Sequence, residues 1–243
     1  MHLSTAHRPA DGVVERRLTL DGVPGILWTP DPPASAPAPA ILLGHPGGLE
    51  RMYPRLLARA ARAAADGFAT ATIELPGSGD RPRLPDLEAA RADLRRAITR
   101  GEPVDDDVVD RLVLPLVEAA VPECRRLLDA LEAEGVGGPF GYSGGIVSLG
   151  VRLAAVEPRV VAAGLFAGSR IPRAIIEQAR QVRIPTHVLL QWDDAGNDRQ
   201  EALSLFDALG SPDKTLQANM GGHTGVPEHA AEDAARFFVR HLR

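Results

Sequence analysis

A serine between glycines is the residue of this chain best suited to covalent chemistry. Residues 141–145 read Gly-Tyr-Ser-Gly-Gly, after a short apolar segment (136–140) typical of a buried strand and before an apolar segment (145–155) typical of a buried helix. Glycines at both ends allow a strand to turn directly into a helix, because a Cβ atom there would meet the opposite arm of the turn. We therefore expect Ser143 at a tight, strained turn, with its hydroxyl presented as a nucleophile.

A serine hydroxyl needs a base that accepts its proton and an acid that holds this base in one tautomer. His223 follows two glycines between a predicted strand (214–218) and a predicted helix (228–242), so a loop can bring its imidazole to the edge of a sheet. Asp193 and Asp194 directly follow a predicted strand (186–192). Either aspartate could serve as the acid, or both could cap the helix that begins near Asp198. Among the other histidines, His229 lies in a predicted helix.

The order of these residues resembles the α/β-hydrolase superfamily, in which the Gly-x-Ser-x-Gly turn is followed by an Asp or Glu and then by a His. The resemblance implies that Ser143 is the nucleophile and His223 the base. The family places its acid a few residues beyond the strand, which favours Asp194 and leaves Asp193 as the alternative.

An oxyanion hole needs two backbone N–H donors aimed at the developing negative charge. Gly144, directly after the nucleophile, is expected to supply one donor. The other should come from the turn after a predicted strand (40–45), where the family's His-Gly-x becomes His45-Pro46-Gly47. Because Pro46 has no N–H, Gly47 is the first possible donor and Gly48 the fallback. We expect His45 to brace this turn rather than to titrate in catalysis.

The elements that must position these residues alternate along the chain. Strand patterns cover residues 16–20, 23–28, 40–45, 68–75, 136–140, 160–166, 186–192 and 214–218. Helix patterns cover residues 53–65, 86–99, 105–116, 122–134, 145–155, 172–181, 199–209 and 228–242. This alternation predicts an α/β protein with a doubly wound, mostly parallel sheet and an antiparallel hairpin at one edge. The resemblance implies that residues 1–243 form a single domain with an α/β-hydrolase fold.

The segment between Asp80 and Val136 is longer than a plain crossover between parallel strands requires. We expect its first part, residues 81–116, to form a small helical lid inserted after the fourth strand, and the helix 122–134 to be the crossover. The acidic run 105–107 is expected to begin a helix rather than to bind a metal. Arg81 and Arg83, at the base of the lid, could attract a carboxylate.

Composition excludes several classes of function. The chain has 243 residues and a net charge of −5, and this negative charge argues against a nucleic-acid-binding surface. Its single cysteine, Cys124, excludes an intrachain disulfide. We find no signal peptide, no membrane span, no nucleotide-binding loop and no metal-ligand spacing, so we expect a cytoplasmic protein without cofactor or metal. The N-terminal arm that holds His2 and His7 is expected to be disordered. The oligomeric state is left open.

Together the residues predict a serine hydrolase that cleaves a carboxylic ester, thioester or lactone of a small acyl substrate through an acyl-enzyme on Ser143. The layout resembles esterases related to the dienelactone hydrolases, whose own nucleophile is commonly a cysteine. Three alternatives use the same fold: acyl transfer to an acceptor other than water, cofactor-free perhydrolysis, and ligand binding without turnover.

Overall fold

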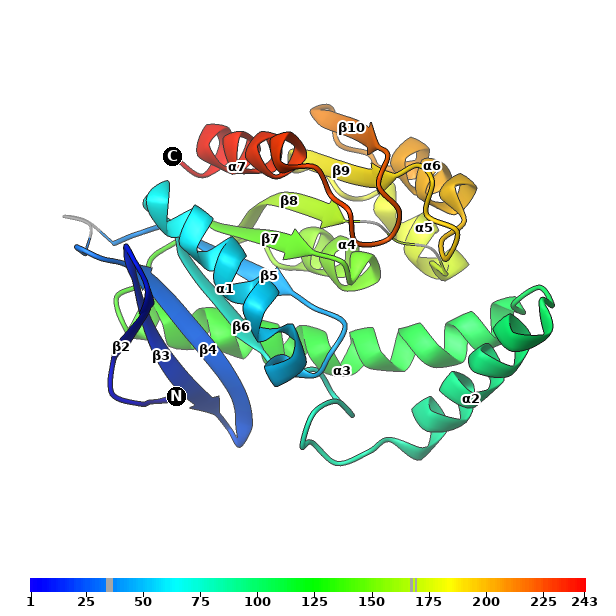
Figure 1. The fold of residues 1–243 in the computed structure, drawn as a ribbon, viewed down its shortest axis with the longest axis horizontal. Coiled ribbons are helices and arrows are strands. Elements are labelled where there is room, and N and C mark those ends of the chain that lie inside the picture. The colour runs from blue at the N-terminus through cyan, green and yellow to red at the C-terminus, as the bar shows by residue number, and fades with distance from the viewer. Residues whose placement is uncertain (34–36, 167, 169) are drawn as a thin grey trace.

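A computed structural model describes residues 1–33, 37–166, 168 and 170–243. These residues form one sheet in the order β1-β3-β4-β6-β5-β7-β8-β9-β10, with β2 paired to β3 (Figure 1). The pairs from β6 through β10 are parallel, and the pairs among β1, β2, β3, β4 and β6 are antiparallel. The strands are β1 (His2–Leu3), β2 (His7–Ala10), β3 (Val13–Leu20), β4 (Val23–Pro30), β5 (Ala40–Gly44), β6 (Ala69–Ile73), β7 (Phe140–Gly144), β8 (Val160–Phe166), β9 (Thr186–Gln191) and β10 (Lys214–Asn219). The mostly parallel sheet with an antiparallel edge is confirmed.

Helices cover both faces of the sheet. Helices α1 (Leu49–Ala65) and α7 (Glu228–Leu242) pack on one face, while α3 (Asp106–Ala133), α4 (Val147–Val156), α5 (Arg173–Ala179) and α6 (Arg199–Ala208) pack on the other (Figure 1). Successive side chains of a strand point to opposite faces. In β5, Leu42 accordingly joins the core under α3 and α4, whereas Ile41 and Leu43 join the core under α1 and α7.

The prediction of two separate helices at 105–116 and 122–134 is wrong, because both belong to the single helix α3 of 28 residues. Pro115 and Pro122 lie inside α3, and both are exposed. The carbonyls that these prolines leave without an N–H partner can therefore be hydrated, and the helix continues. The start of α3 agrees with the expected role of the acidic run, since the side chain of Asp105 caps the helix by accepting the N–H of Asp107 at 2.9 Å.

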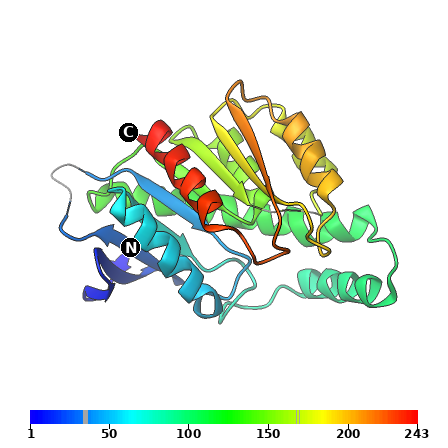
Figure 2. The ribbon, with the colours of Figure 1, turned by 45° about the horizontal axis from the view of Figure 1, so that its top comes forward.

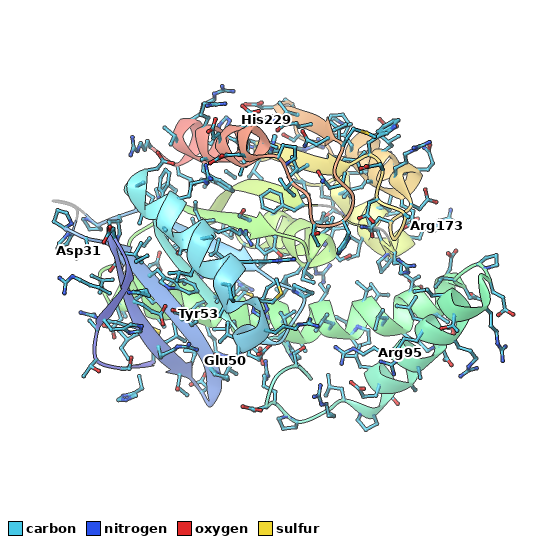
Figure 3. All side chains as sticks on the ribbon, in the orientation of Figure 1. Asp31, Glu50, Tyr53, Arg95, Arg173 and His229 are labelled. Atoms are coloured by element: carbon cyan, nitrogen blue, oxygen red, sulfur yellow. The ribbon has the colours of Figure 1, made fainter. Side chains whose placement is uncertain are left out.

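The segment after β6 forms a helical hairpin in which α2 (Pro85–Arg100) packs against the first half of α3. The hairpin extends beyond the sheet on the side of α5 and α6 (Figures 1 and 2). Arg95, on α2, lies within this hairpin (Figure 3). The N-terminal arm expected to be disordered instead supplies β1 and β2, which pair with β3.

Glu157, directly after α4, is a buried carboxylate that joins α4 to α3. Its oxygens accept hydrogen bonds from Arg159 Nε at 2.9 Å and from Arg125 Nε at 3.0 Å, and its side chain is 2% exposed. Chiefly through the hydrogen bond from Arg159, and against the desolvation that burial causes, these partners lower the pKa of Glu157 to about 2.

Replacing Glu157 by glutamine should lower the free energy of unfolding at pH 7 by about 2–3 kcal/mol. Because the pKa is depressed in the folded state, the carboxylate stabilises the fold fully above its ordinary pKa of about 4.3, and this stabilisation is lost as the pH falls toward 2. Urea unfolding of both proteins from pH 7 to pH 3 measures the difference. Glu118→Gln, at an exposed position of α3, is the matched control. A difference that does not shrink below about pH 4 would contradict the assignment.

Candidate active site

Ser143 lies in β7, near the carboxyl end of a central strand. It pairs with Leu43 of β5 and Gly164 of β8, and it is 5% exposed. The expected strained turn is not formed, since the only described residues other than glycine with a positive φ are Asp21 and Arg170. The reason is that β7 continues through Ser143 and Gly144, so the change from strand to helix occurs later, before α4 begins at Val147.

The glycines of the motif serve close packing of the strand. A Cβ atom at Gly144 would lie 2.6 Å from the Cα atom of Gly44, so β5 can approach β7 here because Gly144 lacks a side chain, and a Cβ atom at Gly44 would meet the hydroxyl of Tyr142 at 2.2 Å. A Cβ at Gly141 would lie 2.9 Å from the ring of Phe238, whereas one at Gly145 would make ordinary contact. The predicted collision at Gly145 is therefore wrong, and the one at Gly141 involves α7 rather than the helix after the serine.

Asp194 and His223 are in contact. Asp194 Oδ2 lies 2.8 Å from Nδ1 of His223, so Nδ1 carries the proton and Nε2 keeps a free lone pair. Asp194 also accepts the N–H of Gly196 at 2.9 Å and the side-chain amide of Asn197 at 2.5 Å. Desolvation favours the neutral acid, but the hydrogen bonds from His223, Gly196 and Asn197 outweigh it and hold the pKa of Asp194 below its ordinary value. A carboxylate therefore faces the imidazole.

Asp193 holds the loop that carries the histidine. Its carboxylate accepts the N–H groups of Gly221 and Gly222, both at 2.9 Å, and Gln191 Nε2 donates to the carbonyl of Gly222 at 2.9 Å. Gly221 has a φ of +134°, and a Cβ atom there would lie 2.2 Å from the carbonyl oxygen of Gly225, so only glycine fits. Asp193 thus positions the loop while Asp194 contacts the imidazole, a division that the sequence leaves open.

The structure does not join Ser143 to this pair. Among the described residues, the hydrogen-bond partner of Ser143 Oγ is Arg59 Nη2, at 2.9 Å, and His223 Nδ1 donates to Asp194. The side chain of His223 is 68% exposed. The loop between β10 and α7 nevertheless passes beside the carboxyl ends of the central strands (Figures 1 and 2).

Arg59, on α1, was not among the residues that the sequence analysis selected. Its Nη1 donates to the carbonyl of Gly44 at 3.3 Å, and its guanidinium lies 5.3 Å from the ring centroid of Phe166. None of the ion pairs formed by the described residues includes Arg59. Burial lowers the pKa of Arg59 to about 10, which leaves the side chain charged at neutral pH. An arginine in an Ala/Arg helix resembles a solvated surface residue, so no sequence pattern indicated this role.

In the turn expected to complete an oxyanion hole, the backbone N–H groups already donate to acceptors within the protein. The N–H of Gly47 donates to His45 Nδ1 at 3.1 Å, and the N–H groups of Gly48 and Leu49 donate to the buried carboxylate of Glu74 at 2.9 and 2.6 Å. His45 Nε2 donates to the carbonyl of Ile73 at 3.1 Å, and desolvation lowers the pKa of His45. His45 therefore braces the turn, as expected, but neither Gly47 nor Gly48 has a free N–H here.

The two arginines considered as carboxylate binders already donate hydrogen bonds to other groups of the protein. Both terminal nitrogens of Arg81 donate to Glu123, at 2.8 and 2.6 Å, and Arg83 donates to the carbonyl of Gly77 at 3.1 Å. Within the described residues, no three His, Cys, Asp or Glu side chains are grouped as metal ligands. No helix in the same part of the chain is both long enough and apolar enough to cross a bilayer.

Comparison with known proteins gives structural neighbours. No family model and no curated protein matches the chain. A cold-adapted esterase from an Arctic intertidal metagenomic library is 27% identical, with a TM-score of 0.75 over 100% of both chains. A Thermus thermophilus protein is 21% identical, with a TM-score of 0.67 over 94% of this chain and 97% of its own. A protein described as a dienelactone hydrolase from Klebsiella pneumoniae is 14% identical, with a TM-score of 0.63 over 95% and 98%. The chain thus has the fold of α/β-hydrolase esterases.

Proposed function

We propose that this protein, which shares its fold with esterases, is a serine hydrolase that cleaves a carboxylic ester, thioester or lactone through an acyl-enzyme on Ser143. The observation that carries the proposal is the contact between Asp194 and His223 at 2.8 Å, which leaves Nε2 of the imidazole available as a base. Parallel strands bring their carboxyl ends to one edge of a sheet, so the strand that holds Ser143 and the loops after β9 and β10 end on the same side.

In the proposed reaction, Ser143 Oγ attacks the carbonyl carbon while its proton passes to His223 Nε2. The bond to the leaving oxygen or sulfur then breaks, and His223 returns the proton to the leaving group. Water, deprotonated by the same nitrogen, attacks the acyl-enzyme, and the carboxylic acid departs while Ser143 regains its proton. Asp194 keeps the imidazole in the required tautomer and stabilises the imidazolium.

Contact between Ser143 and His223 must form when substrate binds. The hydroxyl is held by Arg59, and the loop that carries His223 is exposed, so rotation of the Ser143 side chain and movement of this loop would bring the two together. Catalytic hydrogen bonds that are absent or long without substrate often form only in its presence. Because Arg59 donates to Ser143 Oγ, the hydroxyl proton itself stays available for transfer to the base.

The helical hairpin is proposed to cover the substrate. A cleft of about 740 Å³ separates the hairpin turn from α5 and the start of α6, and it is lined by Val104 and Val109 on one side and by Ile171, Ile176 and Asp198 on the other. Arg173, at the edge of this cleft, faces the opening beside the hairpin (Figure 3).

Product analysis tests the proposal against its alternatives. The purified protein should release free acid from p-nitrophenyl butyrate in water, at a rate proportional to protein concentration. A predominant transfer of the acyl group to added alcohol would instead establish an acyltransferase, and a reaction that needs peroxide would establish perhydrolysis. Failure to turn over or to be acylated by any reactive ester would leave a ligand-binding protein.

A further inference from the structure

A small cavity lies between α1 and α7, on the face of the sheet toward which Ser143 points. Its volume is about 230 Å³, and Ser143 and Arg59 are among the residues that line it. The two helices contribute mainly small side chains, Ala58, Ala63, Ala231, Ala234 and Ala235. Because alanines line both walls, the helices leave a space that larger side chains would have filled.

The cavity is polar at the serine and apolar along much of its length. Arg59 and Ser143 supply a guanidinium and a hydroxyl at one end, and Leu43, Phe166 and Phe238 continue the wall with apolar groups. Further along, the cavity reaches Phe68, with Arg62 and Asp66 beside it. This arrangement matches an acyl group, which carries one polar carbonyl at the reacting end and an apolar chain behind it.

We propose that this cavity is the acyl-binding pocket, that it takes a short-chain or single-ring acyl group, and that Arg59 holds the carbonyl oxygen. The proposal rests on the serine-hydrolase function and adds to it the class of substrate. The volume of the pocket indicates the size of acyl group that it can hold, because a cavity of about 150 Å³ accommodates benzene. A pocket of about 230 Å³ therefore encloses an acyl chain of about four to eight carbons, and a longer chain would have to extend beyond it into solvent.

Arg59 is suited to the carbonyl oxygen for two reasons. The second amide expected to hold this oxygen was Gly47 or Gly48, but these donate to His45 and Glu74 instead, so the turn after β5 offers neither of them as a donor. The guanidinium donates to the carbonyls of Ser143 and Gly44, at 2.5 and 3.3 Å, but it is charged, has further N–H groups and lies 2.9 Å from Ser143 Oγ, next to the place where the attacked carbonyl must sit. A fixed positive charge in a site with little water stabilises the negative charge that develops on this oxygen.

A series of p-nitrophenyl esters from acetate to dodecanoate tests the pocket. For the wild-type protein, kcat/KM should be highest between four and eight acyl carbons and fall at least ~10-fold at twelve. Ala63→Phe, which fills the cavity, should lower the ratio of kcat/KM for hexanoate to that for acetate by about tenfold or more. Ala65→Phe, at an exposed position on the same helix, should leave the ratio unchanged. Ala235→Leu, on the opposite wall, repeats the test if Ala63→Phe does not fold.

The results separate the pocket from the proposed function. If a fluorophosphonate still labels Ser143 but neither filling variant changes the chain-length ratio, the acyl pocket is elsewhere and the function stands. If no residue of the wild-type protein is labelled, the proposed serine-hydrolase function is wrong.

The role of Arg59 has its own readout. Arg59→Met should lower kcat by ~10²-fold for every ester in the series with little change in the chain-length preference, and Arg59→Lys should recover part of the loss. A kcat for Arg59→Met within about threefold of the wild-type value would overturn this assignment.

Discussion

Replacing His223 by alanine should lower kcat for ester hydrolysis by ~10⁴-fold or more, while the free energy of unfolding changes by less than about 1 kcal/mol. The rate falls because Ser143 then has no base, and Asp194 cannot take over the proton from where it lies. The fold tolerates the change because the imidazole is 68% exposed and the loop is held by Asp193 through backbone groups. Hydrolysis of p-nitrophenyl butyrate and urea unfolding measure the two quantities.

His229 supplies the matched control for this variant. It lies six residues further along, at the exposed start of α7 (Figure 3), and it has no place in the proposed reaction. His229→Ala should therefore retain the wild-type rate. A His223→Ala protein that keeps more than about a tenth of the wild-type kcat would show that another group accepts the proton.

The sequence was informative where a local pattern decides the structure. The strand 160–166 was predicted with its observed bounds, because a short run of uncharged, mostly apolar residues is typical of a strand at the centre of a sheet. The positions of Asp194 and His223 after successive strands followed from the alternation of strands and helices, since this alternation brings the ends of strands together. Their contact in the structure accords with that placement.

The sequence was uninformative where contacts between residues distant in the chain determine where a strand or helix ends. Whether β7 ends before or after Ser143 depends on pairing with β5 and β8, and the structure extends this pairing through Gly144. The continuity of α3 depends on which side of the helix Pro115 and Pro122 face, and it is the exposed side. Both features need the tertiary structure, because local propensity alone favours a break at each point.

Two functional candidates were invisible in the sequence for a related reason. Glu74 follows β6 and holds the N–H groups at the start of α1, which takes them away from the expected oxyanion turn. Arg59 contacts Ser143 from a helix residue that lies 84 positions earlier in the chain. Neither residue belongs to a motif with a fixed spacing from Ser143, so their roles appear only when the elements pack. The choice of Ser143, Asp194 and His223 as catalytic residues stays a prediction.

Ser143 itself should be the single residue of the chain that reacts rapidly with a fluorophosphonate. Such a reagent phosphonylates a serine, with loss of fluoride, as a base removes the hydroxyl proton, so an activated nucleophile reacts far faster than an ordinary hydroxyl. Trypsin cleavage after Arg126 and Arg152 yields a peptide, 127–152, that contains both Ser143 and Ser148. Fragmentation of this peptide therefore has to assign the modified residue. Ser148, buried in α4, serves as the internal control.

The most direct test of the account is this labelling, carried out on the wild-type protein and on Ser143→Ala and Ser148→Ala. We expect one adduct per chain on Ser143, unchanged in Ser148→Ala and abolished in Ser143→Ala, with hydrolysis lost in step with labelling. An adduct on any other residue, or a fully folded protein that hydrolyses esters without reacting at Ser143, would contradict the claim that this serine is the nucleophile.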